Sequence, residues 1–133
     1  MKRRRTPPSA APKTFDPRYL DFFVEFNRGA YFEAHDVLEG LWLREKGALA
    51  NFYKGLIQIA GAFVHLSKSR SDPARRLFLL AEKHLAPYAP ACEGLEIGRL
   101  LGRIRGWRRR IEAGEAPASF GLPRRKPAIR LRP

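Results

Sequence analysis

The sequence has 133 residues, a hydrophobic content of 44% and a formal net charge of +13. This length suits one domain, the apolar content excludes a disordered chain, and the lone Cys92 excludes an intramolecular disulfide and a metal site made only of cysteines. The charge is uneven: residues 1–15 carry +5, residues 16–98 carry −1 and residues 99–133 carry +9. We therefore expect a nearly neutral central region with basic ends.

The two ends are predicted to lie outside the folded domain. Because prolines interrupt both ends, residues 1–14 are predicted to be a disordered basic arm and residues 115–133 a disordered Pro/Arg-rich tail. Residues 15–114 remain as the predicted domain. No signal-peptide apolar core follows the basic N-terminus, and the longest apolar run, residues 55–66, is too short to span a membrane. These features predict a cytoplasmic protein with no membrane partner, and they carry no indication of oligomeric state.

The first two predicted helices lie between clear start and stop signals. The first begins at Asp16-Pro17, because aspartate accepts hydrogen bonds from free N–H groups and proline suits the first helical position. It carries a helical stripe of aromatic residues and ends at Gly29, a typical left-handed cap. The second helix is predicted from about residue 31 to residue 46, where Gly47 can stop it.

Three more helices complete the predicted domain. The third, from about residue 49 to residue 67, is apolar on most sides, which is typical of a helix at the centre of a bundle. The fourth starts at Ser71-Asp72-Pro73, and the fifth runs from about residue 95 to residue 113. The sequence has no alternating strand pattern and no Asn-Gly or Asp-Gly turn. It therefore predicts an all-α fold, a compact bundle of about five helices with mainly antiparallel neighbours.

The apolar face of the second helix contains ionisable side chains. At about 100° per residue, His35, Glu39 and Trp42 lie on one side of this helix, and Tyr31 flanks them. An unpaired carboxylate is costly to bury, so Glu39 needs an ion pair, a proton or a metal ion.

The third helix offers partners for this pair. Its narrow polar stripe includes Gln58, Gly61 and His65, and the glycine leaves a hollow in the middle. If the stripe faces the second helix, Gln58 and His65 join His35 and Glu39 in a buried polar cluster. Imidazole nitrogen and carboxylate oxygen are ligands that zinc, iron and manganese accept.

Three interpretations of the cluster stay open. In the first, His35, Glu39 and His65 hold one divalent metal ion (zinc, iron or manganese) with a position left for water. In the second, the same side chains form a hydrogen-bonded network that fixes helix register. In the third, His35 and Glu39 exchange a proton with a small-molecule ligand without metal. Hydrolysis is the reaction class to test first if the chain is an enzyme, which the sequence leaves open. In that scheme Glu39 is a ligand or the general base, and the pocket is lined by Tyr31, Trp42 and Gln58.

Residues 26–42 resemble the signature of a known family. They read Phe-Asn-Arg-Gly-Ala-Tyr-Phe-Glu-Ala-His-Asp-Val-Leu-Glu-Gly-Leu-Trp. This run is similar to that of the bacterial and archaeal family called domain of unknown function 309, whose hallmark is His-x-x-x-Glu-x-x-Trp. His35, Glu39 and Trp42 match all three positions of the hallmark. Asp36 stands where the family usually has Glu.

A second block extends the resemblance. Residues 52–60 and His65 are similar to the downstream block of the family, so the likeness covers about residues 15–90. It implies an all-α bundle and a motif that has been regarded as a metal-binding site. It implies no reaction.

The basic ends indicate a second class of function. Arginine outnumbers lysine 19 to 7, which suits bidentate phosphate contacts. The candidate anion-binding residues on the fifth helix are Arg105, Arg108, Arg109 and Arg110. No helix-turn-helix, ribonucleoprotein or zinc-finger motif is present. The alternative function is therefore a non-enzymatic module that contacts RNA or another anionic partner weakly and nonspecifically through its basic ends, with His35 and Glu39 as a structural network.

Overall fold

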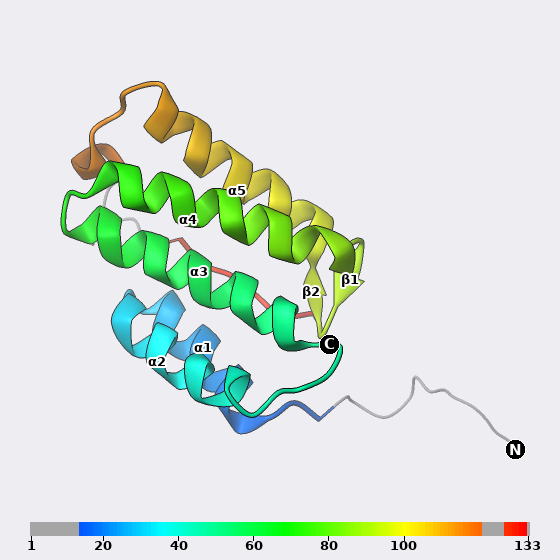
Figure 1. The fold of residues 1–133 in the computed structure, drawn as a ribbon. Coiled ribbons are helices and arrows are strands. Elements are labelled where there is room, and N and C mark those ends of the chain that lie inside the picture. Colours follow the sequence, from blue (N-terminus) through cyan, green and yellow to red (C-terminus); the bar gives the residue numbers. More distant parts are fainter. Residues whose placement is uncertain (1–13, 121–126, 133) are drawn as a thin grey trace, which may run out of the picture.

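The computed structural model describes residues 14–120 and 127–132, so most of the predicted arm and part of the predicted tail lie outside the described residues. Five helices make up most of the described chain (Figure 1). They are α1 (Pro17–Asn27), α2 (Tyr31–Trp42), α3 (Ala50–Ser67), α4 (Ser71–Leu85) and α5 (Ile97–Glu112). Short 3-10 turns, η1 (Ala86–Tyr88) and η2 (Pro117–Phe120), follow α4 and α5. The predicted all-α class is confirmed.

The starts and ends of the helices agree only in part with the predicted signals. The Asp16 carboxylate accepts from the Arg18 N–H at 2.8 Å, and Gly29 has a φ of 87°, so α1 is capped as predicted. The helix α4 begins at Ser71, as predicted, but it has no side-chain cap. Asp72 instead pairs with the arginines that follow it by three and four residues.

A small β-hairpin replaces the predicted start of the fifth helix. Strands β1 (Ala91–Cys92) and β2 (Leu95–Glu96) pair antiparallel, and α5 begins only at Ile97. The two residues between the strands, Glu93 and Gly94, both have positive φ, at 48° and 77°. Positive φ at both central positions is the conformation of a type I′ hairpin turn, here formed by Glu-Gly rather than Asn-Gly or Asp-Gly. The expectation of no hairpin is therefore wrong.

The five helices form a curved row in which each packs against the next in sequence. In Figure 1, α2, α3 and α4 lie side by side toward the viewer, and α1 lies behind α2. Trp42 of α2 contacts Lys54 of α3, and His35 lies beside Gly61, so α2 and α3 are antiparallel. No helix among the described residues is both long and apolar enough to cross a membrane.

Phe63 of α3 marks the centre of the core. Its ring lies 5.6 Å from Phe26 of α1, 5.2 Å from Tyr31 of α2, 5.5 Å from Phe78 of α4 and 4.9 Å from Trp107 of α5, between ring centroids. Each of the other four helices thus contributes an aromatic ring to one residue of the central helix. This arrangement confirms the predicted central position of the third helix.

Residues 127–132 cross the back of the bundle. The Asn27 amide at the end of α1 donates to the Ile129 carbonyl at 2.9 Å and accepts from the Ile129 N–H at 2.8 Å. On the other side, Arg103 of α5 donates to the Ala128 carbonyl at 2.6 Å. The Ile129 side chain is buried. We call residues 127–132 the C-terminal segment; although the sequence placed this stretch in a tail, it links α1 to α5.

Candidate functional site

The candidate site lies on α2, where one turn of helix brings three donor side chains together. His35, Asp36 and Glu39 each offer a ligand atom, and these atoms lie within 4.8 Å of one another. His35 and Glu39 are half-buried and Asp36 is exposed, so the site borders solvent rather than lying in the core. The buried cluster predicted from the sequence is therefore a partly exposed one.

The ring of His35 is directed between α2 and α3. Its Nδ1 atom is shielded from water and forms no hydrogen bond. The Asp36 carboxylate lies 3.5 Å from this atom. On α3, a Cβ at Gly61 would lie 3.8 Å from Cδ2 of His35, at ordinary van der Waals distance. The imidazole therefore packs beside Gly61.

Tyr31 and Trp42 lie at opposite ends of the same helix. Trp42 is half-buried, with the Lys54 ammonium 5.4 Å from its ring centroid. Tyr31 is buried against the ring of Phe63, and its hydroxyl has no hydrogen-bond partner. Burial raises the pKa of Tyr31 to about 12, so the hydroxyl stays protonated at neutral pH. Both residues therefore flank the donor group, as a protonated phenol and an indole paired with a cation.

Gln58 is buried, as expected of a pocket residue, but it contacts the opposite neighbour of α3. Its Oε1 atom lies 2.9 Å from Nδ1 of His84 on α4. Burial lowers the pKa of His84, and the charge of Lys54 lowers it further. His84 is thus a neutral partner of Gln58 near neutral pH, and sequence spacing gave no signal for this pair.

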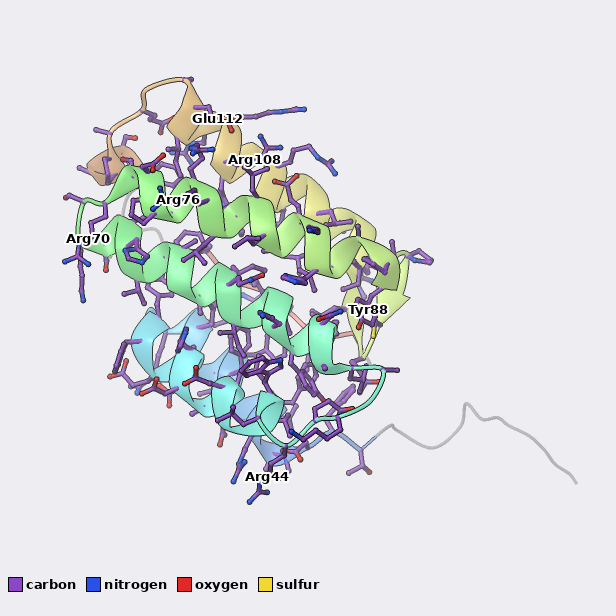
Figure 2. All side chains as sticks on the ribbon, in the orientation of Figure 1. Arg44, Arg70, Arg76, Tyr88, Arg108 and Glu112 are labelled. Carbon is purple, nitrogen blue, oxygen red and sulfur yellow. The ribbon has the colours of Figure 1, made fainter. Side chains whose placement is uncertain are left out.

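His65 lies on α3 near the chain reversal into α4, apart from the group formed by His35, Asp36 and Glu39. Its Nδ1 atom is shielded and has no hydrogen-bond partner. Its pKa is lowered, first by burial and then by the charges of three cations around it, Arg70, Lys68 and Arg76. Figure 2 places Arg70 and Arg76 at this end of α3 and α4. The same cations that disfavour a charged imidazole would repel a metal ion.

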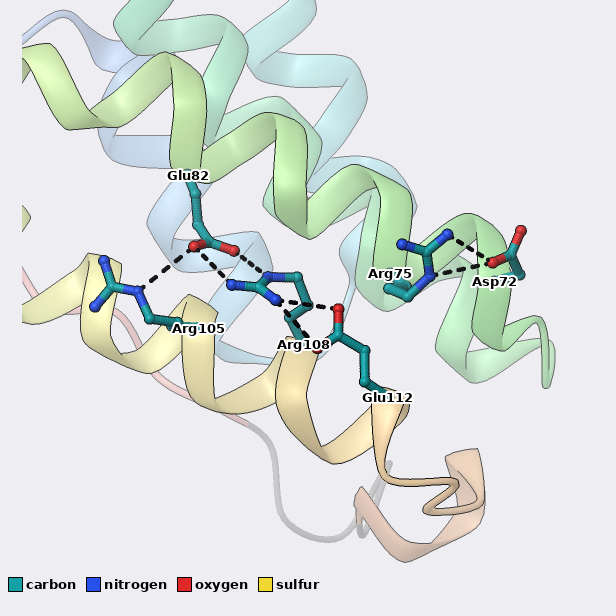
Figure 3. A network of polar contacts seen from close by, with 6 residues as sticks. All are labelled: Asp72, Arg75, Glu82, Arg105, Arg108 and Glu112. Atoms are coloured by element: carbon teal, nitrogen blue, oxygen red, sulfur yellow. Dashed lines mark hydrogen bonds and ion pairs between the residues drawn. The ribbon is translucent and has the colours of Figure 1, made fainter.

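The predicted anion-binding arginines of α5 already have carboxylate partners in most cases (Figure 3). Arg108 donates to Glu82 of α4 at 2.5 Å and to Glu112 at 3.0 Å, and Arg105 lies 3.6 Å from Glu82. These carboxylates raise the pKa of Arg108 further. Much of the positive charge on this face of α5 is therefore neutralised within the described chain.

The remaining two arginines differ from each other. Arg110 pairs with Glu115, and its guanidinium lies 4.0 Å from the ring centroid of Phe120. This arginine and the hydroxyl of Ser119 lower the pKa of Glu115 to about 2. Arg109 is exposed. The binding of RNA or another anionic partner through the basic ends stays a prediction, as do the cytoplasmic location and the small-molecule ligand.

Comparison with known proteins assigns part of the chain to a family. A model described as domain of unknown function (DUF309) matches residues 19–77, from α1 to the first half of α4. Comparison with curated proteins and with solved structures gives no significant match. The matched segment contains His35, Asp36, Glu39 and His65, and it leaves out α5 and the C-terminal segment. The family resemblance of the sequence is confirmed over residues 19–77, which match the DUF309 model.

Proposed function

We propose that His35, Asp36 and Glu39 hold one divalent metal ion, with zinc, iron and manganese as candidates. The observation that carries this proposal is the shielded Nδ1 atom of His35, which has no hydrogen-bond partner and lies 3.5 Å from the Asp36 carboxylate. Polar atoms shielded from water normally have partners. A cation between an imidazole nitrogen and two carboxylate oxygens would supply one, and this donor set suits all three metals.

The distances between the donor atoms are close to those that one metal ion requires. Two ligands of one zinc ion, each at about 2.1 Å, can lie at most about 4.2 Å apart. The three donors lie within 4.8 Å of one another, so a small side-chain rotation is needed. The Asp36 side chain is 55% exposed and can make this rotation without disturbing the core.

Charge favours Asp36 over His65 as the third ligand. Two carboxylates and one neutral imidazole carry a charge of −2, which a divalent ion neutralises. His65 lies among three cations and is not part of the donor group. We therefore propose His35, Asp36 and Glu39 as the ligand set, in place of the set with His65 that the sequence suggested.

The proposed donor set makes hydrolysis the reaction class to test first. A divalent metal ion held by three protein donors would supply an activated water at its open positions. Glu39 is a ligand in this proposal, whereas the sequence alone left it as a ligand or the general base. Trp42 and Tyr31 limit the space on either side of the donors along α2.

Metal binding can be measured directly on the full-length chain. Protein stripped with chelator is titrated with zinc and with manganese by isothermal calorimetry, and the metal content of protein purified without chelator is determined by mass spectrometry. We expect about one ion per chain. His35→Gln and Asp36→Asn should each weaken binding at least tenfold, because each removes one of three donors.

His65→Gln is the matched control, because it makes the same substitution at a half-buried histidine of the neighbouring helix. The metal affinity of this variant should lie within twofold of the wild-type value. Circular dichroism should show that all three variants fold without metal. Equal losses in His35→Gln and His65→Gln, or absence of binding in the folded wild type, would contradict the proposed site.

A further inference from the structure

A second candidate site lies outside residues 19–77, between α5 and the C-terminal segment. A cavity of about 230 Å³, partly open to solvent, lies between β2, the first half of α5 and the C-terminal segment. Part of its wall is apolar and consists of Leu95, Leu100, Ala128 and Ile129. The remainder is charged and consists of Glu96, Arg99, Arg103, Arg130 and Arg132.

The charges around this cavity do not balance. Four arginines face one carboxylate, that of Glu96. Glu96 is shared, because its oxygens lie 3.0 Å from Arg132 and 3.5 Å from Arg99. Within residues 14–120 and 127–132, neither Arg103 nor Arg130 has a carboxylate at ion-pair distance. The cavity therefore has an excess charge of +3.

Arg103 is the cation held most firmly in place. It is half-buried, its guanidinium lies 5.0 Å from the ring centroid of Trp107, and Nη1 donates to the carbonyl of Ala128. A guanidinium has five N–H donors. Burial lowers the pKa of Arg103, and the charge of Arg99 lowers it further, which shows that the positive charge is poorly compensated here.

These features contrast with those of two other arginines of α5. Arg108 and Arg110 have carboxylates as their partners, whereas Arg103 has a neutral carbonyl and an aromatic ring. A planar guanidinium that is fixed in position and lacks a counter-ion is suited to bidentate binding of a carboxylate or phosphate. The apolar wall formed by Leu100 and Ile129 would contact the remainder of such a ligand.

We propose that this cavity binds a small organic oxyanion, a phosphate or carboxylate joined to a short apolar group. The oxyanion lies against Arg103 and Arg130, and the apolar group lies against Leu100 and Ile129. The volume accommodates a molecule of about the size of a substituted benzene. The proposal does not depend on the metal site, which lies on α2.

The test uses phenyl phosphate and benzoate as probes, with phenol as the neutral control. Full-length chain labelled with ¹⁵N is titrated with each probe, and the backbone amides of residues 128–132 and the Arg103 Nε–H are followed by NMR. We expect saturable shifts of these signals with one or both anions. Phenol should bind at least tenfold more weakly, because it lacks the charge. Saturation by phenol at the same concentration, or shifts spread over all basic residues, would overturn the proposal.

Variants distinguish binding in this cavity from nonspecific attraction of anions to the positively charged surface. Arg103→Gln and Arg130→Gln should each lower the affinity for the more tightly bound of the two anions at least fivefold. Arg109→Gln, which removes an exposed arginine of the same helix, should change the affinity less than twofold. Because Arg103 also holds the C-terminal segment, the Ile129 amide signal of each ligand-free variant shows whether that segment stays docked. Arg130→Gln leaves the Ala128 contact intact, so equal affinity losses in Arg130→Gln and Arg109→Gln would contradict the site even if Arg103→Gln displaces the segment.

Discussion

Asp36 shows what helical spacing can and cannot predict about the site. Neighbouring residues of a helix point about 100° apart, so the pattern grouped His35 with Glu39 and placed Asp36 elsewhere. In the structure the Asp36 carboxylate bends back to within 3.5 Å of His35. The contact of Gln58 with His84 also escaped prediction, because it depends on which neighbour of α3 the Gln58 side chain faces. Side-chain direction at the edge of a face is set by the neighbouring helices.

Two glycines of α3 provide a prediction at this scale. At Gly61 an added Cβ would lie 3.2 Å from a methyl of half-buried Leu77, whereas at Gly55 it would lie 2.6 Å from Cγ of fully buried Leu85. Gly61→Ala should change the free energy of unfolding by less than about 1 kcal/mol, because the gain in helix propensity offsets a small shift of Leu77. Gly55→Ala should lower it by about 1–3 kcal/mol through overpacking.

Urea unfolding of the two alanine variants, followed by circular dichroism, measures both changes. Each variant replaces one glycine of the same helix with alanine, so both gain the same helix propensity. The difference between their free energies of unfolding therefore measures the effect on packing. Equal losses of stability would show that Leu85 can move as easily as Leu77, contrary to its burial.

Among the elements, the existence of each helix was predictable and several boundaries were not. The stripes of α1 and the apolar surface of α3 come from periodicity that is visible in the sequence. However, α2 ends at Trp42 rather than near residue 46, where the chain turns toward α3. Leu95 and Glu96 pair with β1 instead of starting α5. These boundaries depend on contacts with segments that are distant in sequence or on the space available for a turn.

The contact between α4 and α5 carries the next prediction. The side chains of Glu82 and Arg108 are only 15% and 16% exposed, and they form two hydrogen bonds (Figure 3). Glu82→Gln should lower the free energy of unfolding by about 1–3 kcal/mol, because it leaves a shielded guanidinium without its main counter-ion. Urea unfolding at neutral pH measures this loss.

Asp72→Asn is the control for that measurement, since Asp72 also pairs with two arginines but its side chain is 59% exposed. Solvent screens such a pair, so the expected loss is much smaller than in Glu82→Gln. A loss in Asp72→Asn as large as in Glu82→Gln would mean that burial does not decide the strength of these pairs.

At the scale of the whole molecule, the distribution of charge and burial predicts how stability depends on pH. The pKa values of His65 and His84 are lowered mainly by burial. Below the unfolded histidine value of about 6.5, the unfolded chain therefore binds more protons than the folded chain. The free energy of unfolding should be highest above this value and fall as the pH decreases from about 7 to about 5.

A second loss is expected at lower pH, where carboxylates take up protons. The pKa of Asp72 is lowered mainly by its hydrogen bond from Arg75, and that of Glu115 is lowered to about 2 by Arg110 and Ser119. Both groups therefore stabilise the fold above about pH 4 and lose this contribution as the pH falls further. Urea unfolding at a series of pH values resolves the two ranges. In the double variant of His65→Gln and His84→Gln, the loss of stability between about pH 7 and pH 5 should become smaller, and the loss at lower pH should stay the same. An unchanged loss between pH 7 and pH 5 would show that these two histidines do not cause it.

The net charge of +13 divides into parts with different partners. On one face of α5, carboxylates of the chain itself bind the arginines, as Glu82 binds Arg108. On the other face of α5, Arg103 and the C-terminal segment line a cavity with excess positive charge. A high isoelectric point alone suggested a nucleic-acid partner, because composition cannot show which cations already have a counter-ion.

The link between Asn27 and Ile129 has a consequence for the order in which the molecule is assembled. The two residues are 102 positions apart, so their hydrogen bonds can form only after the ribosome has added residue 129. The donor group of α2 needs only α2 and α3, which are made much earlier. A nascent chain therefore contains every residue of the proposed metal site before the residues that line the proposed oxyanion cavity on the side of the C-terminal segment have been made.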